Sequence, residues 1–281
     1  MPNVYTHPLL ATEHTAQDSG AESLAFGIAR RCGMPLAAVL PIASNPEYEA
    51  MAPQVAARAE AQAGERLRAL AADAASAGVA LELRARRGPE PYAEIVGEAS
   101  ERGADLIVIR RRGQRGLLAN VLVGEMVRNV VSHAPCSVLV APRGAAMWSQ
   151  RVLVAIDPQA GDLAPVETAA AIAAECALPL TIVCVSEPAA DAMQRAETTL
   201  QRAWTAARGH GVTVDATVRI GRPHEQIVAA ARQGGADLIV IGRRGTETLA
   251  RAWLGGVAQK VIGLADRPVL VAIPTTKGAN P

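Results

Sequence analysis

The chain has 281 residues, of which 50% are hydrophobic and 20% charged, with a formal net charge of +1. This is enough for two globular domains, and the near-neutral charge argues against a nucleic-acid or anionic-membrane binder. Aromatic residues make up 2% of the sequence, which leaves few side chains for stacking bases, so we expect a small-molecule partner.

In the first half, short aliphatic runs alternate with Ala-rich amphipathic stretches. The runs are predicted strands, at Pro8–Thr12, Leu36–Leu40, Val79–Arg86, Leu106–Ile109 and Val138–Ala141. A long helix is predicted over Pro53–Ala77, with acidic residues that balance its arginines, as on a solvated surface helix. A Pro-, Gly- and Ala-containing link follows from Pro142 to Gln150, so we place domain 1 at residues 1–144 and domain 2 at residues 149–281.

The second half repeats this plan. Its predicted strands are Arg151–Ile156, Leu180–Val185, Val212–Arg219, Leu238–Ile241 and Val269–Ala272. The predicted helices between them are Asp162–Ala177, Ala189–Arg208, Pro223–Gly234 and Gly255–Leu264. Near-continuous apolar strands separated by helices predict an α/β fold: two doubly wound, five-stranded parallel sheets of Rossmann-like type.

An internal repeat supports this division. The segment Gly-Ala-Asp-Leu-Ile-Val-Ile occurs at Gly103–Ile109 and again, residue for residue, at Gly235–Ile241. Further matches follow in the same order, including Cys32-x-x-Pro-Leu with Cys176-x-x-Pro-Leu. The chain therefore contains a duplicated domain.

The ligand-binding edge of such a sheet lies beyond the carboxyl ends of its first and fourth strands. In the second half, Asp157 follows the first strand, where it can accept hydrogen bonds from a ribose or help to hold a metal; an acid that merely initiates the loop is the alternative. Gly242, Arg243 and Gly245 follow the fourth strand. Glycines let backbone N–H groups approach a phosphate, and Arg243 and Arg244 can add positive charge at the rim.

A helix predicted to begin at Gly255 completes this candidate site. Its first N–H groups and its positive dipole end form a natural anion site. The alternative is that the glycines only shape a tight loop and that the arginines are solvated.

The pattern Gly-x-x-Gly, nine residues, then Gly-Gly resembles the universal stress protein signature, Gly-x-x-Gly-x9-Gly-Ser/Thr. The resemblance covers nearly the whole of each half. It implies that an adenine nucleotide such as ATP, with or without Mg²⁺, contacts the positions that match the family's binding residues: Asp157, Val185, Gly242, Gly245, Gly255, Gly256 and Val257. It also implies an internal pseudo-dimer through the last strands, Val138–Val140 and Val269–Val271, with further homodimerisation open.

Two departures from the signature affect the expected binding. Gly256 replaces the family's Ser/Thr, which removes a hydroxyl donor to phosphate. The first half departs further, because Glu13, Pro41, Arg110 and Glu125 stand at the binding positions. We expect that site to be empty, with Glu125 either stabilising its helix or pairing with Arg110, Arg111 or Arg112.

Other chemistry lacks its required parts. The five histidines show no metal-ligand spacing, although His224 stands near the candidate site, and we expect no metal centre. Asp105 and Asp237 precede their strands and so belong to the opposite edge, where capping is expected. No Walker A, dinucleotide-binding or Gly-x-Ser-x-Gly motif occurs, and neither Lys260 nor Lys277 is well placed for nucleotide hydrolysis or adenylation, so we expect no enzyme.

The cellular location is also an expectation. Cys32, Cys136, Cys176 and Cys184 form no Cys-x-x-Cys pair and have apolar neighbours, as reduced core thiols do. The N-terminal segment shows no basic region followed by an apolar run. We expect a cytoplasmic stress-response protein that binds ATP or a related adenine nucleotide in its second domain. The alternative is a nucleotide-independent interaction scaffold with both sites degenerate.

Overall fold

Each half of the chain folds as five parallel strands connected through helices in the computed structural model, which describes residues 4–111, 124–159, 161–243 and 254–274. The elements of domain 1 are β1 (Pro8–Ala11), α1 (Ser19–Cys32), β2 (Leu36–Ala43), α2 (Pro46–Met51), α3 (Pro53–Ser76), β3 (Leu81–Gly88), α4 (Pro91–Arg102), β4 (Leu106–Arg110), α5 (Glu125–His133) and β5 (Ser137–Ala141). Those of domain 2 are β6 (Val152–Ile156), α6 (Ala164–Cys176), β7 (Leu180–Ser186), α7 (Ala190–Arg208), β8 (Val214–Ile220), α8 (Pro223–Gln233), β9 (Leu238–Gly242), α9 (Gly256–Leu264) and β10 (Val269–Ala272).

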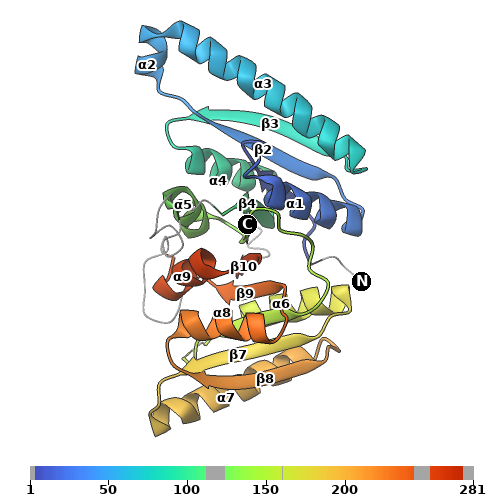
Figure 1. Cartoon of the computed structure of the whole chain (residues 1–281), viewed down its shortest axis with the longest axis vertical. Helices are drawn as coiled ribbons and strands as arrows, with labels where there is room; N and C mark the ends of the chain where they lie inside the picture. The colour runs from blue at the N-terminus through green and yellow to red at the C-terminus, as the bar shows by residue number, and fades with distance from the viewer. Residues whose placement is uncertain (1–3, 112–123, 160, 244–253, 275–281) are drawn as a thin grey trace, which may run out of the picture.

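The two domains share one sheet. Its strand order is β3-β2-β1-β4-β5-β10-β9-β6-β7-β8, and all pairs are parallel except the central one. There β5 and β10 run antiparallel with Leu139 opposite Leu270, so the last strands of the domains join them along the middle of the molecule (Figure 1). This confirms the doubly wound fold and the internal pseudo-dimer.

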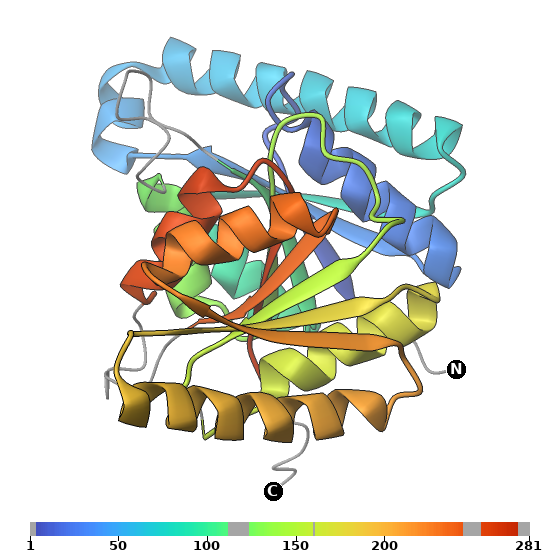
Figure 2. The same ribbon diagram turned by 60° about the horizontal axis from the view of Figure 1, so that its bottom comes forward.

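Helices cover both faces of the sheet because its buried strands have apolar side chains on both sides. On one face α1, α3, α6 and α7 pack over residues such as Leu10 and Val154. On the other, α4, α5, α8 and α9 pack over the alternate residues, such as Leu9 and Leu153. In Figure 2, α3 and α7 lie at opposite ends of the molecule. Each core cluster contains residues of both domains, so the pseudo-dimer has continuous apolar layers.

Some local predictions were inaccurate. The short helix α2 was not predicted, and β2 ends at Ala43 rather than at Leu40. Strands β3 and β8 begin at Leu81 and Val214 rather than at Val79 and Val212. Gly78 has a φ of 71°, which reverses the chain after α3, and the Val79 N–H donates to the Ala74 carbonyl at 2.9 Å. Val79 therefore belongs to the turn that ends α3. Its β-branched side chain had favoured a strand.

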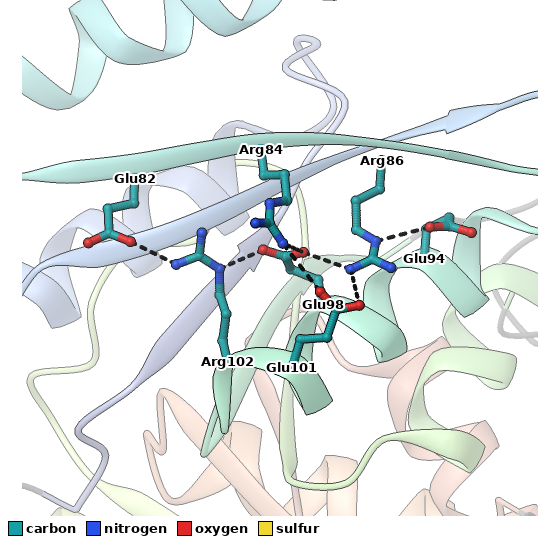
Figure 3. Close-up of polar contacts among 7 residues, drawn as sticks. All are labelled: Glu82, Arg84, Arg86, Glu94, Glu98, Glu101 and Arg102. Carbon is teal, nitrogen blue, oxygen red and sulfur yellow. Dashed lines mark hydrogen bonds and ion pairs between the residues drawn. The ribbon is translucent and has the colours of Figure 1, made fainter.

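An ion-pair cluster joins edge strand β3 to α4 (Figure 3). The side chain of Glu98 is wholly buried and accepts hydrogen bonds from Arg84 at 3.2 Å, Arg86 at 3.0 Å and Arg102 at 2.5 Å. Burial alone would raise the pKa of Glu98, but the three guanidinium groups outweigh it and hold the pKa below its ordinary value. The repeat places Ala230 at the equivalent position of domain 2, so this carboxylate is a feature of domain 1.

Candidate functional site

The carboxyl ends of β6 and β9 bring the predicted acid and the first signature glycine to the same edge of domain 2. These strands are parallel neighbours with Ala155 opposite Ile241, so Asp157 and Gly242 both lie at the point where the strands end. Asp157 is partly exposed, and its Oδ1 accepts a hydrogen bond from the Gln159 N–H at 2.8 Å. Within the described residues the Asp157 side chain takes part in this hydrogen bond and in no ion pair.

Helix α9 provides the backbone donors of this site. Gly255 is its N-cap residue, and the Gly255 N–H donates to the Arg243 carbonyl at 3.0 Å, which joins the end of β9 to the start of the helix. The N–H groups of Gly256, Val257 and Ala258 precede the first intrahelical bond and point out of the helix end, which also has the positive end of the dipole. We call Asp157, Gly242, Gly255 and Gly256 the domain-2 site.

The remaining predicted residues have different surroundings. Val185 is 6% exposed and packs in the core on the α8 and α9 face, and Val257 is 42% exposed beside the helix start. Gly245 and Arg244 lie outside the described residues.

Arg243 is directed differently from our expectation. Its Nη1 donates to the carbonyls of Ser132 at 3.4 Å and Ala134 at 3.2 Å, which belong to the C-terminus of α5 in domain 1. A helix C-terminus is the negative end of the dipole and has unsatisfied carbonyls, so it is a natural partner for a guanidinium. Arg243 therefore bridges the two domains in this structure instead of being held out at the rim.

The matching edge of domain 1 is occupied by its own side chains. Arg110 donates from Nη2 to Glu13 at 2.8 Å and from Nη1 to Asp18 at 3.0 Å, and also to the Thr15 hydroxyl at 2.8 Å. Asp18 is 1% exposed, so this ion pair is deeply placed. The cavity left beside it has a volume of about 20 Å³, room for about one water molecule. A phosphate chain would have to displace Arg110.

These contacts bear on the expected pairing of Glu125 with Arg110, Arg111 or Arg112, of which Arg112 lies outside the described residues. Arg110 does form an internal ion pair, but with Glu13 and Asp18 and not with Glu125. Glu125 instead stands on the exposed first turn of α5, 3.7 Å from Arg128. We did not predict Asp18 as a partner of Arg110. Its place five residues after Glu13, opposite the end of β4, was a signal that could have indicated it.

The repeated acids at the opposite edge are capping residues, as predicted. Asp105 accepts hydrogen bonds from the N–H groups of Thr6 at 2.6 Å and His7 at 3.0 Å. Asp237 does the same for Ser149 at 2.6 Å, Gln150 at 2.9 Å and Arg151 at 3.1 Å. Each acid fixes the chain that enters the first strand of its domain, far from the ligand edge.

The other titratable groups of the described residues were compared with the requirements of a metal site. No group of three or more His, Cys, Asp or Glu side chains within the described residues is arranged to hold a metal ion. His224, at the start of α8, has a lowered pKa, first through burial and then through the positive charge of Lys260. In the part of the chain that the structure describes, no helix is both long and apolar enough to cross a lipid bilayer.

A duplicated, doubly wound α/β fold with a glycine-lined helix N-terminus at the switch in strand order defines a nucleotide-binding-type protein. The model of the universal stress protein family matches the chain twice, over residues 5–142 and 149–272. The chain therefore belongs to the universal stress protein family.

Individual relatives agree with this assignment. Universal stress protein MJ0577 of Methanocaldococcus jannaschii is 39% identical over 61 residues, which are 22% of this chain and 38% of that protein. A universal stress protein of Thermus aquaticus is 46% identical over 57 residues, 20% of this chain and 42% of that protein. The chain thus matches less than half the length of these curated relatives.

A solved structure that covers nearly the whole chain shows the same fold. The crystal structure of a universal stress protein from Archaeoglobus fulgidus DSM 4304 has a TM-score of 0.77 at 19% identity and covers 98% of this chain and 100% of that chain. A universal stress protein in complex with cAMP has a TM-score of 0.39 at 26% identity over 46% of this chain and 99% of that chain. One from Archaeoglobus fulgidus in complex with dAMP has a TM-score of 0.39 at 24% identity over 45% of this chain and 100% of that chain.

Proposed function

We propose that this protein is a cytoplasmic stress-response factor that binds ATP or a related adenine nucleotide in domain 2 and has no catalytic apparatus. One contrast supports the proposal. The domain-2 site keeps glycines and an acid without an ion pair among the described residues, whereas Arg110 fills the matching edge of domain 1. Members of the family have been solved with cAMP and with dAMP, which is consistent with an adenine nucleotide here.

Each part of the domain-2 site has a role in this proposal. The N–H groups of Gly256, Val257 and Ala258 donate to phosphate oxygens, aided by the dipole of α9. The second oxygen of Asp157 accepts a ribose hydroxyl or holds a Mg²⁺ ion through water. Gly242 keeps the end of β9 free of a side chain, so that the backbone can approach the ligand.

The rival proposal is a nucleotide-independent scaffold whose paired domains present a surface to another protein. Gly256 favours it, because this residue lacks the hydroxyl of the family signature. A lost hydrogen bond to a charged group weakens binding by about 1.5–3 kcal/mol. Homodimerisation of the whole chain is compatible with either proposal.

Calorimetric titration of the full chain with ATP, ADP and AMP separates the two. We expect a single binding event per chain, abolished by Gly242→Arg, which copies the residue of domain 1. Gly64→Arg is the matched control, because it adds the same side chain to α3, where a Cβ at Gly64 meets no atom within 4 Å. No heat and no thermal shift at millimolar nucleotide would leave the scaffold as the better proposal.

A separate experiment tests the proposal that the protein does not hydrolyse ATP. Phosphate release from ATP is measured with the wild-type protein and with Asp157→Ala, and we expect both to remain at background. A clear rate in the wild type that Asp157→Ala removes would show that the protein is an enzyme.

A further inference from the structure

A pair of arginines crosses between the domains in opposite directions. Arg111 follows β4 and Arg243 follows β9, at equivalent positions of the repeat. Arg111 Nη1 donates to the carbonyls of Ile262 at 3.4 Å, Gly263 at 3.2 Å and Ala265, at the C-terminus of α9. Arg243 makes the equivalent contacts with the C-terminus of α5. We call these contacts the crossed arginine bridges.

Both bridges act on the same part of domain 2. Arg243 is the second residue of the glycine signature, directly after Gly242, and its carbonyl accepts a hydrogen bond from the Gly255 N–H at the start of α9. Its guanidinium is fixed to domain 1, so the base of the phosphate-binding segment has a support outside its own domain. Arg111 fixes the other end of α9, the helix whose first N–H groups face the phosphate. The signature is therefore attached to domain 1 near its beginning, and the helix that follows it is attached to domain 1 at its C-terminus.

Removal of the Arg111 contacts should be unfavourable for α9. Arg111 is partly buried, and this burial lowers the pKa of its guanidinium, with the nearby charge of Asp266 acting in the opposite direction. It remains protonated, because arginine does not lose its proton in proteins. The last carbonyls of a helix have no intrahelical partner, so without Arg111 those of Ile262 and Gly263 lose a donor.

Arg110 and Arg111, neighbours at the end of β4, act on different domains. Arg110 points into its own domain and occupies the edge where a ligand would bind, and Arg111, the next residue, reaches into domain 2. The same strand end thus closes one site and supports the other. The position of the end of β4 in domain 1 therefore matters for domain 2, even if domain 1 binds no ligand itself.

We propose that Arg111 and Arg243 are positioning residues of the domain-2 nucleotide site, through which domain 1 sets the affinity of domain 2. This inference rests on the proposed nucleotide binding. Neither guanidinium needs to touch the ligand. Each holds one end of the structure that presents the backbone donors, so breaking a bridge lets α9 shift and weakens its contacts with phosphate. Coupling between sites commonly changes affinity by about five- to 150-fold.

The test compares three arginine-to-methionine variants of the full chain, with AMP and ATP as probes. Arg111→Met and Arg243→Met each break one bridge. Arg267→Met is the matched control, because Arg267 also donates to carbonyls at a helix C-terminus, those of Ala231 and Ala236, but within domain 2 and at α8. Arg111→Lys is added because it keeps the charge and one donor, so it folds even if the methionine variant does not.

We expect similar losses of thermal stability in the three methionine variants, but a five- to tenfold higher Kd in Arg111→Met and Arg243→Met alone, with partial recovery in Arg111→Lys. An unchanged Kd in Arg111→Met, or a loss in Arg267→Met as large as in the bridge variants, would overturn the inference while leaving nucleotide binding intact. A wild-type protein that binds neither AMP nor ATP would remove the proposed function, and this inference with it.

Discussion

Gly256 offers the sharpest test of how phosphate would be held. A Cβ built at Gly256 meets no heavy atom within 4 Å, so Gly256→Ser adds the family's hydroxyl without a steric cost. The residue is the first of α9, beside the unpaired N–H groups. A hydrogen bond from this hydroxyl to phosphate is expected to strengthen binding by about 1.5–3 kcal/mol, roughly ten- to hundredfold in Kd.

The same substitution also changes the helix, and this effect must be separated. Relative to glycine, alanine stabilises a helix by about 1 kcal/mol and serine by about half of that. Gly256→Ala therefore raises the thermal stability without supplying a donor, and is the matched control. Calorimetry with ATP and AMP should show tighter binding for serine alone. Equal affinities of the serine and alanine variants would refute the idea that α9 faces the phosphate.

Three further predictions concern titratable groups. Glu98→Gln should lower the free energy of unfolding by about 1–3 kcal/mol at pH 7, measured by urea denaturation, because the three guanidinium groups lose the negative charge of their shared acceptor. The pKa of Glu98 is lower in the folded state, so its ion pairs stabilise the protein above the pKa of the unfolded chain, about 4.3, and this stabilisation disappears on acidification. The difference in unfolding free energy between wild type and Glu98→Gln should therefore shrink at low pH. A difference that does not change with pH would contradict this. Burial raises the pKa values of Cys136 and Cys184 to about 12, so both thiols should resist a thiol reagent at pH 8 until urea unfolds the protein. The NMR titration of His224 should give a pKa below about 6.5 and neutral imidazole at pH 7, and stability should decrease as the pH falls through this range; a higher value would contradict the burial seen here.

The fold could be predicted because its signals are local and repeated. Runs such as Leu106–Ile109 and Leu238–Ile241 are apolar at every position, which is characteristic of strands buried on both faces. Their order along the chain, with helices between, leaves few topologies open. The capping roles of Asp105 and Asp237 followed from the same pattern, because each acid precedes its strand.

The interactions that cross the molecule could not be predicted in the same way. The target of Arg111 depends on the antiparallel register of β5 and β10, which no local pattern encodes. Glu98 was not singled out from the sequence, because its ion pairs need three arginines that converge from β3 and from its own helix. An arginine at the same position of both repeats, Arg111 and Arg243, was the available hint of a shared role.

The pairing of β5 with β10 within one polypeptide has an evolutionary consequence. In a dimer of identical chains, any substitution alters both halves at once, so a change that blocks one pocket blocks its twin. Covalent fusion removes that constraint and also makes the association independent of protein concentration. In this molecule Arg110 occupies the edge of domain 1 whereas Gly242 stands at the equivalent position of domain 2, a difference that a dimer of identical chains cannot have.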